Sequence, residues 1–257
     1  MTLPTTPGYS IAHLALKFPL ATAAVCACIY AANVSYDESL PTVVFTFDDG
    51  YASAETNVLP IMNIYKFPAT SYLSTGLLNT QNYLSDIQVK NLVTYNWELG
   101  GHTINHDDMT KIPDAAQYTN LLVPQKYIEE TYHVPASSFA SPHGEFNSNT
   151  LPKIEQVYDN HVNAFSTFAG INTRETFDLY NIHRLVIKSD VNVKELCDRI
   201  LSLKPEETFV MAFHDIIQTP NDEYDVSIEN FKSITKCVNE TNLNVLTLTQ
   251  AANEMRK

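Results

Sequence analysis

Glycine, tryptophan and basic side chains are scarce in this chain of 257 residues. It contains 7 glycines, 1 tryptophan and 16 lysines and arginines, against 29 aspartates and glutamates. So little glycine argues against low-complexity disorder. The formal net charge of −13 argues against nucleic acid or an anionic membrane surface as a partner. A neutral or cationic substrate is compatible with this charge.

The conspicuous apolar run, Phe18–Ala32, is too short for a transmembrane helix, which needs about 20 residues. It is uncharged and follows Lys17, which favours the core of a signal peptide within a targeting segment over residues 1–40. The alternative is an extra helix packed on the domain that follows. The targeting interpretation predicts a secreted or cell-envelope protein.

The 4 cysteines form two groups. Cys26 and Cys28 belong to the apolar run and would leave with a cleaved targeting segment. Cys197 and Cys237 lie on two expected helices. They would form a disulfide in an oxidising compartment or remain as two buried thiols. Neither spacing is that of a zinc clip.

Residues 41–257 alternate between strand and helix patterns, which is typical of parallel βα units. A (β/α) barrel of this length is common. Pro124 is expected to kink or split one long helix. We expect strands over 42–47, 69–73, 98–101, 138–140, 164–167, 185–187, 208–213 and 245–248, and helices over 54–65, 85–92, 115–132, 151–158, 193–203, 228–239 and after Thr249.

Two adjacent carboxylates end the first expected strand. Pro41–Phe45 is apolar and rich in β-branched residues, and Thr46–Gly50 continues it with the sequence TFDDG. Neighbouring side chains on an extended chain point in opposite directions. Asp48 and Asp49 can therefore do different work, one accepting a proton while the other binds a metal. An ordinary Asp-rich turn is the alternative.

Two histidines four positions apart follow in Glu98–His106 (ELGGHTINH). On a helical turn, residues i and i+4 share one face, so His102 and His106 can reach one ion. With one aspartate they make three ligands and leave a position open. This is the ligand count of a catalytic zinc site rather than a structural one.

TFDDG and HTINH resemble the first two motifs of the NodB-type polysaccharide deacetylases, the family 4 carbohydrate esterases. Phe139–Gly144 (FASPHG) is similar to the third motif, and Met211–His214 (MAFH) to the last. Lys66–Leu73 also resembles the second strand of the family. The likeness runs from about residue 41 to residue 250. It implies a distorted, often incomplete (β/α) barrel, with the motif residues at strand C-termini.

The resemblance and the spacing together imply metal-dependent hydrolysis. Asp49, His102 and His106 would hold a divalent metal, most simply Zn²⁺, with Co²⁺ or Ni²⁺ as alternatives. Asp48 would be the general base and His214 the general acid for the leaving amine. The family's third motif implies an oxyanion contact from a backbone N–H near His143.

The sequence departs from the commonest family pattern in two places. Ala140 stands where the third motif often carries the Arg that orients the catalytic Asp. Arg184 is the candidate to replace it by pairing with Asp48, and a solvent-facing Arg at a strand edge is the alternative. The family's Asp-Trp motif has no clear match, and Asp178, the nearest acidic residue, receives no role.

For several other side chains near the motifs, the sequence gives weaker evidence of a role in substrate binding. Pro142 and His143 are candidates for a sugar groove, although Pro-His-Gly is also an ordinary turn. Tyr51, directly after TFDDG, is a candidate for the groove wall. Trp97 is expected in the core or at its rim. Three histidines without partners at ligand spacing are expected on the surface or in loops: His133, His161 and His183.

Two functions of different classes remain. The first is removal of N-acetyl groups from chitin oligomers, peptidoglycan or poly-N-acetylglucosamine, with acetylxylan less favoured. The Phe-Ala-x-Pro form of the third motif leans toward bacterial envelope glycans. The second is a barrel that binds carbohydrate with weak or no turnover, which the presence of base, ligands and acid argues against. An acetylated glycan is the expected partner, and a monomer is assumed.

Overall fold

Strand β1 (Thr42–Phe47) pairs with three other strands of the sheet, and all six of its residues are buried. The computed structural model describes residues 36–163 and 170–257. The apolar run of the expected targeting segment and the expected strand 164–167 lie outside the described residues. Both therefore stay predictions, as does the division of the chain after residue 40.

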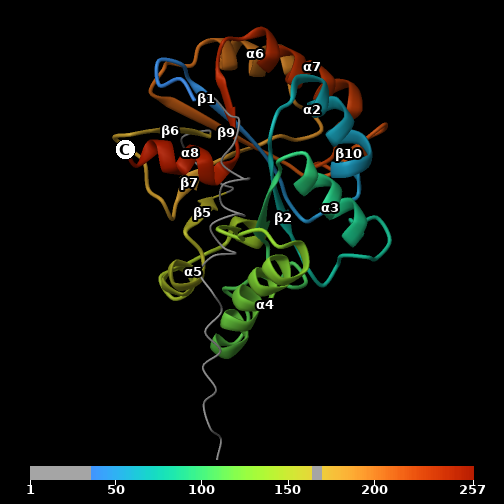
Figure 1. Cartoon of the computed structure of the whole chain (residues 1–257), viewed down its shortest axis with the longest axis vertical. Helices are drawn as coiled ribbons and strands as arrows, with labels where there is room; N and C mark the ends of the chain where they lie inside the picture. The colour runs from blue at the N-terminus through green and yellow to red at the C-terminus, as the bar shows by residue number, and fades with distance from the viewer. Residues whose placement is uncertain (1–35, 164–169) are drawn as a thin grey trace, which may run out of the picture. The chain divides into compact units, whose positions relative to one another are not determined.

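The parallel strands, β1 among them, form a nearly closed ring (Figure 1). From β1 the pairing runs in parallel through β2 (Thr70–Leu73), β3 (Glu98–Gly101), β4 (Ser138–Ala140), β5 (Asn160–Asn163) and β7 (Ile182–His183). After a single residue, β8 (Leu185–Val186) pairs with β9 (Glu207–Phe213), which returns to β1. This ring is the distorted (β/α) barrel that the sequence predicts.

Shorter strands lie beside the ring. Strand β12 (Asn244–Leu246) pairs with the first half of β1, and β6 (Ile171–Thr173) runs antiparallel to β9. A separate parallel pair, β10 (Ile216–Ile217) and β11 (Val226–Ser227), follows β9. The sequence analysis missed β5, β6, β7, β10 and β11, because strands of two to four residues are too short to show a clear period.

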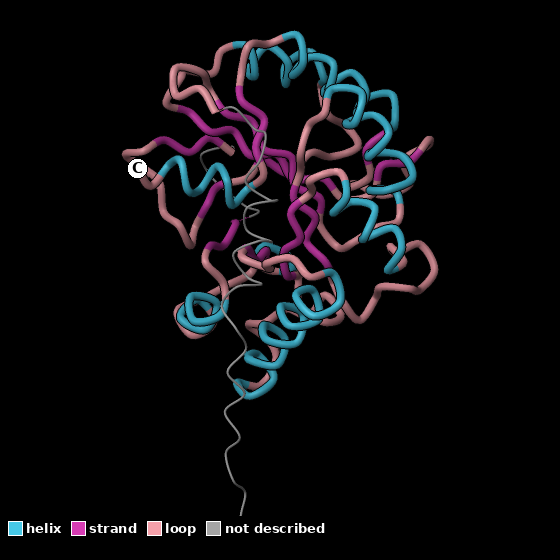
Figure 2. The backbone as a smooth tube through the Cα atoms, viewed as in Figure 1, coloured by secondary structure: helices cyan, strands magenta, loops and turns pink. Residues whose placement is uncertain are grey.

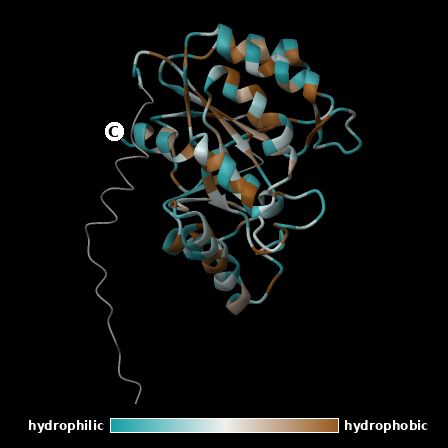
Figure 3. Ribbon diagram, turned by 45° about the vertical axis from the view of Figure 1, so that its right-hand side comes forward, coloured by the Kyte–Doolittle hydropathy of each residue, from teal (hydrophilic) through white to brown (hydrophobic). Residues whose placement is uncertain are grey.

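Helices cover the outside of the ring (Figure 2). Several show one apolar and one polar face (Figure 3), as expected for helices packed on a sheet. The bounds are η1 (Ala54–Val58), α2 (Leu59–Tyr65), α3 (Asp86–Thr94), α4 (Asp114–Tyr132), η2 (Pro142–Gly144), α5 (Leu151–Val157), α6 (Val193–Leu201), α7 (Ile228–Glu240) and α8 (Leu248–Met255). None of the helices in the described part of the chain is long and apolar enough to cross a membrane.

Two local predictions have different outcomes. Ser85 caps α3 through a capping box with Gln88, which the Ser-x-x-Gln spacing of residues 85–88 predicts. Pro124, in contrast, does not split α4, which runs as one helix. Leu121 and Ile128 are buried on either side of the proline. Their packing offsets the hydrogen bond that proline removes.

An aromatic cluster fills the core beside β1. Phe47 stacks on Trp97 and Phe213, with ring centroids 5.0 and 5.4 Å apart. Phe231 of α7 meets Phe47 edge-on. Trp97 is fully buried, so it belongs to the core rather than to a sugar-binding surface.

The prediction that the three lone histidines lie on the surface is wrong for two of them. His133 is exposed, whereas His161 and His183 are buried in β5 and β7. His161 Nδ1 lies 2.8 Å from the Tyr180 carbonyl, and its Nε2 lies 2.8 Å from Ser141 Oγ. Such partners offset the cost of burying an imidazole. Burial lowers the pKa of His161 to about 4.

The two cysteines on α6 and α7 are free thiols. Cys197 and Cys237 are both half-buried. Burial, with a hydrogen bond and charge repulsion from Cys197, raises the pKa of Cys237 to about 12. Cys237 is therefore protonated at neutral pH and is a poor nucleophile.

A buried carboxylate joins three strands of the ring to α8. Glu98 accepts hydrogen bonds from the hydroxyls of Thr70 (3.2 Å), Ser138 (2.6 Å) and Thr249 (2.7 Å). The backbone N–H of Thr249, in the first turn of α8, donates a fourth at 2.9 Å. Glu98 therefore holds α8 against the strand ends opposite the motif residues.

Glu98→Gln is expected to destabilise the protein by about 1–3 kcal/mol, because an amide nitrogen would face donors and leave some unpaired. Urea unfolding measures this as a lower midpoint with an unchanged slope. Glu240→Gln is the matched control, since Glu240 lies on the surface of α7. It is expected to change stability by less than about 0.5 kcal/mol. Equal midpoints for the two variants would refute the anchoring role of Glu98.

Candidate metal and catalytic site

The motif residues meet at the C-terminal ends of the strands. Asp48 and Asp49 follow β1, His102 follows β3 and His214 follows β9. The Asp48 N–H donates to the Phe213 carbonyl at 2.9 Å, which joins the ends of β1 and β9. Loops at this end of a barrel converge, so residues far apart in sequence share one mouth.

Asp49 lies between the two histidines of HTINH. Its Oδ1 is 3.1 Å from His102 Nε2 and 3.2 Å from His106 Nε2. One ligand atom from each of the three side chains lies within 4.8 Å of the others. The structure thus brings together the three residues that the sequence analysis selected as ligands.

The donor set fits a divalent ion. His102 Nδ1 lies 2.7 Å from the Ala140 carbonyl, which only accepts, so Nδ1 carries the hydrogen and Nε2 is free to ligate. Asp49 Oδ1 is buried without a hydrogen-bond partner in the described structure. Two atoms bound about 2.0–2.1 Å from one tetrahedral ion lie about 3.3 Å apart, close to the distances here.

The charges at this cluster favour a cation. Burial disfavours charge on His102, but Asp49 and Asp48 outweigh burial and raise its pKa. Burial and the neighbouring His102 lower the pKa of His106 to about 4, so His106 is neutral at physiological pH. A neutral imidazole is the form that binds metal. The negative charge of Asp49 can therefore be neutralised either by a proton on His102 or by a bound metal ion.

The expectation that HTINH forms a helical turn is wrong. The segment is a loop of turns in which Thr103 and His106 have φ of 64° and 62°. Thr103 Oγ1 accepts from the Asp107 N–H at 3.0 Å, and Asn120 Oδ1 accepts from the Ile104 N–H at 3.0 Å. These bonds hold left-handed backbone that helix geometry does not contain. The two imidazoles converge through this turn, rather than along one helix face.

Arg184 is the single residue between β7 and β8, and it forms a buried pair with Asp48. Its Nη1 lies 2.7 Å from Asp48 Oδ1 and its Nη2 lies 2.8 Å from Oδ2. Arg184 is 1% exposed and Asp48 4%. Burial alone would raise the pKa of Asp48, but the charge of Arg184, with His102, outweighs it and holds the pKa well below its usual range. Asp48 is therefore an oriented carboxylate.

Two residues that the sequence analysis did not select support this pair. Arg184 Nη1 donates to Thr46 Oγ1 at 3.0 Å, and Thr46 Oγ1 donates to the Met211 carbonyl at 2.9 Å. The guanidinium Cζ lies 5.4 Å from the centre of the Tyr72 ring. Thr46 near the end of β1 and Asp48 just after it are two positions apart, so on an extended chain their side chains point to the same side. That spacing is a signal from which Thr46 could have been found.

No carboxylate of the described residues forms a hydrogen bond or ion pair with His214, but Asp48 and Asp49 lie close enough to interact with its charge. Its Nδ1 is buried without a hydrogen bond, and its ring packs on Tyr224 with centroids 5.1 Å apart. Asp178 is occupied elsewhere, accepting from the Tyr180 N–H at 3.0 Å. The structure thus gives Asp178 no role at this site.

The groove candidates differ in position. Tyr51 stacks on Tyr83, with ring centroids 5.2 Å apart. His143 is exposed and packs on His106, with ring centroids 4.5 Å apart. Pro142 is buried in η2. His143 has φ of 58°, a strained value for a non-glycine residue.

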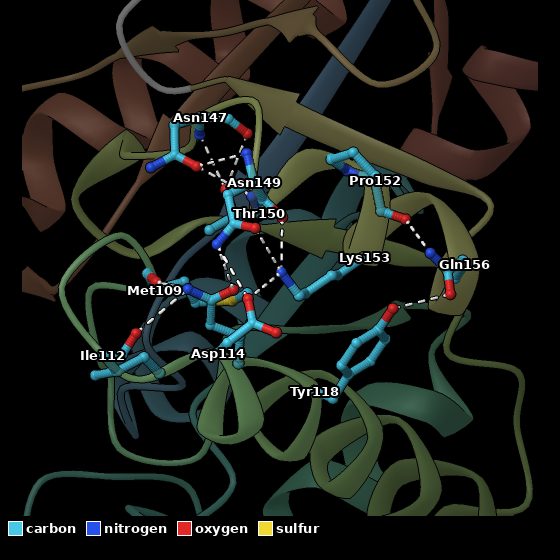
Figure 4. Close-up of polar contacts among 11 residues, drawn as sticks. Met109, Ile112, Asp114, Tyr118, Asn147, Asn149, Thr150, Pro152, Lys153 and Gln156 are labelled. Carbon is cyan, nitrogen blue, oxygen red and sulfur yellow. Dashed lines mark hydrogen bonds and ion pairs between the residues drawn. The ribbon is translucent and has the colours of Figure 1, made fainter.

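The loop that follows His143 is anchored by a buried lysine (Figure 4). Lys153 Nζ lies 2.7 Å from Asp114 Oδ1 and donates to the backbone carbonyl of Asn149 at 2.9 Å. Asn147 Oδ1 accepts from the Thr150 N–H at 3.0 Å. These contacts tie the third-motif loop to the first turn of α4, which follows the HTINH segment.

A nearly closed ring of parallel strands carries an Asp-His-His cluster and an Arg-held aspartate at its C-terminal mouth, an arrangement that a metal-dependent hydrolase could use. The family model for polysaccharide deacetylases matches residues 36–158. This part of the chain, a little under half of it, is therefore similar to the polysaccharide deacetylases.

Its relatives are distant. It is 22% identical over 162 residues to the putative polysaccharide deacetylase YxkH of Bacillus subtilis, covering 63% of this chain and 57% of that protein. It is 27% identical over 163 residues to the poly-beta-1,6-N-acetyl-D-glucosamine N-deacetylase of Staphylococcus aureus, covering 58% and 55%. The chain thus spans little more than half the length of these curated relatives.

The fold is also that of a solved carbohydrate esterase domain. The Xyl-CE4 domain of a multidomain xylanase from the hindgut metagenome of Trinervitermes trinervoides superposes with a TM-score of 0.60 at 18% identity. The superposition covers 83% of this chain and 90% of that domain. The resemblance in fold therefore extends well beyond residues 36–158.

Proposed function

We propose that this protein removes N-acetyl groups from a GlcNAc-containing glycan by metal-dependent hydrolysis. One observation carries the proposal. Asp49, His102 and His106 converge on one point, directly beside an Asp48 that Arg184 holds ionised. A set of metal ligands and a separate base within one mouth are the parts that metal-dependent hydrolysis of an amide uses.

The residues of the chain take distinct roles in this proposal. A divalent ion bound by Asp49, His102 and His106 would polarise the acyl carbonyl and lower the pKa of a water to about 7. Asp48 accepts the proton of the attacking water, and Arg184 fixes the direction of its carboxylate. His214 donates a proton to the leaving amine. A backbone N–H near His143 faces the oxyanion.

The substrate class rests on the comparisons and on charge. A relative carries the name poly-beta-1,6-N-acetyl-D-glucosamine N-deacetylase, which supports a GlcNAc polymer. The net charge of −13 favours a neutral or cationic polymer over an anionic one. Chitin oligomers and peptidoglycan are the alternatives within this class, and acetylxylan lies outside it.

Chelation is expected to stop acetate release, and zinc is expected to restore it, because none of the side chains that the structure describes at the site can act as a Lewis acid in place of the ion. Acetate is measured enzymatically with poly-N-acetylglucosamine oligomers, chitohexaose, muropeptides and acetylxylan, on untreated, EDTA-treated and zinc-supplemented full chain. Metal content is determined by mass spectrometry on the same samples. Full activity without metal would refute the mechanism. Glycan binding without acetate release by the zinc-loaded protein would support a carbohydrate-binding function instead.

A further inference from the structure

We infer that Tyr224 is a positioning residue that sets the orientation of the His214 imidazole by ring packing. The inference rests on the proposed function, in which His214 is the general acid. Nδ1 of His214 is buried and has no hydrogen-bond partner in the described structure. An imidazole without such a bond has neither its tautomer nor its ring angle fixed by polar contacts.

Ring packing is the contact that the described residues give this imidazole. The His214 and Tyr224 rings lie 5.1 Å apart between centroids, with 50° between their planes. This distance and tilt are within the range of favourable aromatic pairs. A tyrosine ring that stays in place therefore restricts the directions in which His214 can point its proton.

The backbone around Tyr224 is held by several hydrogen bonds. Asp225 is buried, and its Oδ2 accepts from the N–H groups of Asn221 and Asp222, each at 2.9 Å. The Tyr224 N–H donates to Asp222 Oδ1 at 3.0 Å. The 221–225 loop is thus folded around the Asp225 carboxylate, and these bonds hold the backbone of Tyr224 in place.

Neighbouring segments fix the same loop from two sides. The Val226 N–H donates to the Asp215 carbonyl at 2.9 Å, next to His214 itself. The Ser189 N–H donates to the Glu223 carbonyl at 2.9 Å. Lys188 Nζ lies 4.9 Å from the centre of the Tyr224 ring, close enough for a cation–π contact. Tyr224 is therefore anchored to the end of β9 and to the segment after β8.

Kinetics of three variants test this role. Tyr224→Leu is expected to lower kcat by about 10- to 100-fold, the scale of a misplaced catalytic group. KM, zinc content and Tm are expected to stay near wild-type values. Tyr224→Phe keeps the ring and is expected to keep most of kcat. Tyr95→Leu is the matched control at an exposed tyrosine after α3 and is expected to leave kcat unchanged. Wild-type kcat in Tyr224→Leu would overturn the inference.

A second measurement does not depend on turnover. Diethyl pyrocarbonate modifies accessible imidazoles, and the tryptic peptide Ile200–Lys232 contains His214 as its one histidine. The labelling rate is expected to rise severalfold in Tyr224→Leu and to stay the same in Tyr224→Phe and Tyr95→Leu. This pattern in a protein that releases no acetate would refute the proposed function while supporting the contact. Equal labelling of all four proteins would refute the positioning role.

Discussion

Replacement of His102 by asparagine is expected to abolish acetate release. His102 is 2% exposed, and its Nε2 lies 3.1 Å from Asp49 Oδ1. Without it the cluster keeps two ligands, and the zinc content of the purified protein is expected to fall below half of the wild-type value. The loss of about 4 kcal/mol of Lewis-acid stabilisation corresponds to about a thousandfold in rate.

His133→Asn is the matched control for this substitution. His133 is exposed and has φ of 59° at the C-terminus of α4, a conformation that asparagine tolerates. Zinc content, kcat and Tm are expected to match the wild type in this variant. If His102→Asn bound zinc and released acetate like the wild type, the assignment of the metal ligands would be wrong.

The residues of the mouth could be selected from sequence because each motif carries its own chemistry. The motif TFDDG ends an apolar run that is long enough to be recognised as a buried strand, and HTINH contains two histidines at a spacing typical of metal ligands. The parallel βα pattern then places both at one end of the sheet. Their proximity follows from topology without knowledge of any contact.

The path between the two histidines could not be predicted in the same way. The i, i+4 spacing fits a helix, yet the backbone takes left-handed values at Thr103 and His106. The loop is stabilised by Asn120, a residue of α4 that is distant in sequence. Spacing therefore identified the ligands, while a tertiary hydrogen bond sets the turn that carries them.

The position of Arg184 also depends on tertiary structure. The chain leaves its pairing with β5 after His183 and pairs with β9 from Leu185. Arg184, between these two pairings, is aimed into the ring toward Asp48. Strands of two residues, such as β7 and β8, are too short to show the alternation of buried and exposed side chains. The sequence therefore left open whether Arg184 faces solvent. For the same reason, the sequence did not show that His161 and His183 are buried in the short strands β5 and β7.

Replacement of Arg184 by methionine is expected to leave Asp48 as an unpaired buried carboxylate. Loss of one partner of such a pair costs about 3–5 kcal/mol of stability. The pKa of Asp48 is expected to rise, since burial then acts without the opposing guanidinium. We expect kcat to fall at least about a hundredfold, because the base is both misoriented and less ionised. Stopped acetate assays between pH 5 and pH 9 and urea unfolding measure the two effects.

The direction of the pH effect follows from the sign of the shift. In the wild type the folded pKa of Asp48 lies below the unfolded value of about 3.9. The pair therefore contributes stability above that pH, and the contribution is lost as the pH falls through the folded pKa. In Arg184→Met the acidic limb of the kcat profile is expected to move to higher pH. An unmoved limb with an unchanged kcat would remove Arg184 from the mechanism.

A double variant separates the stability of the pair from its role in catalysis. Asp48→Asn combined with Arg184→Met removes both buried charges, and the two residues are in direct contact. Its loss of stability is expected to be smaller than the sum of the two single losses by about 1–3 kcal/mol. Acetate release is expected to stay absent, because the base is gone in either background. A loss of stability smaller than the sum would show that the two charges stabilise each other in the fold, whereas additive losses would show that the two side chains act independently.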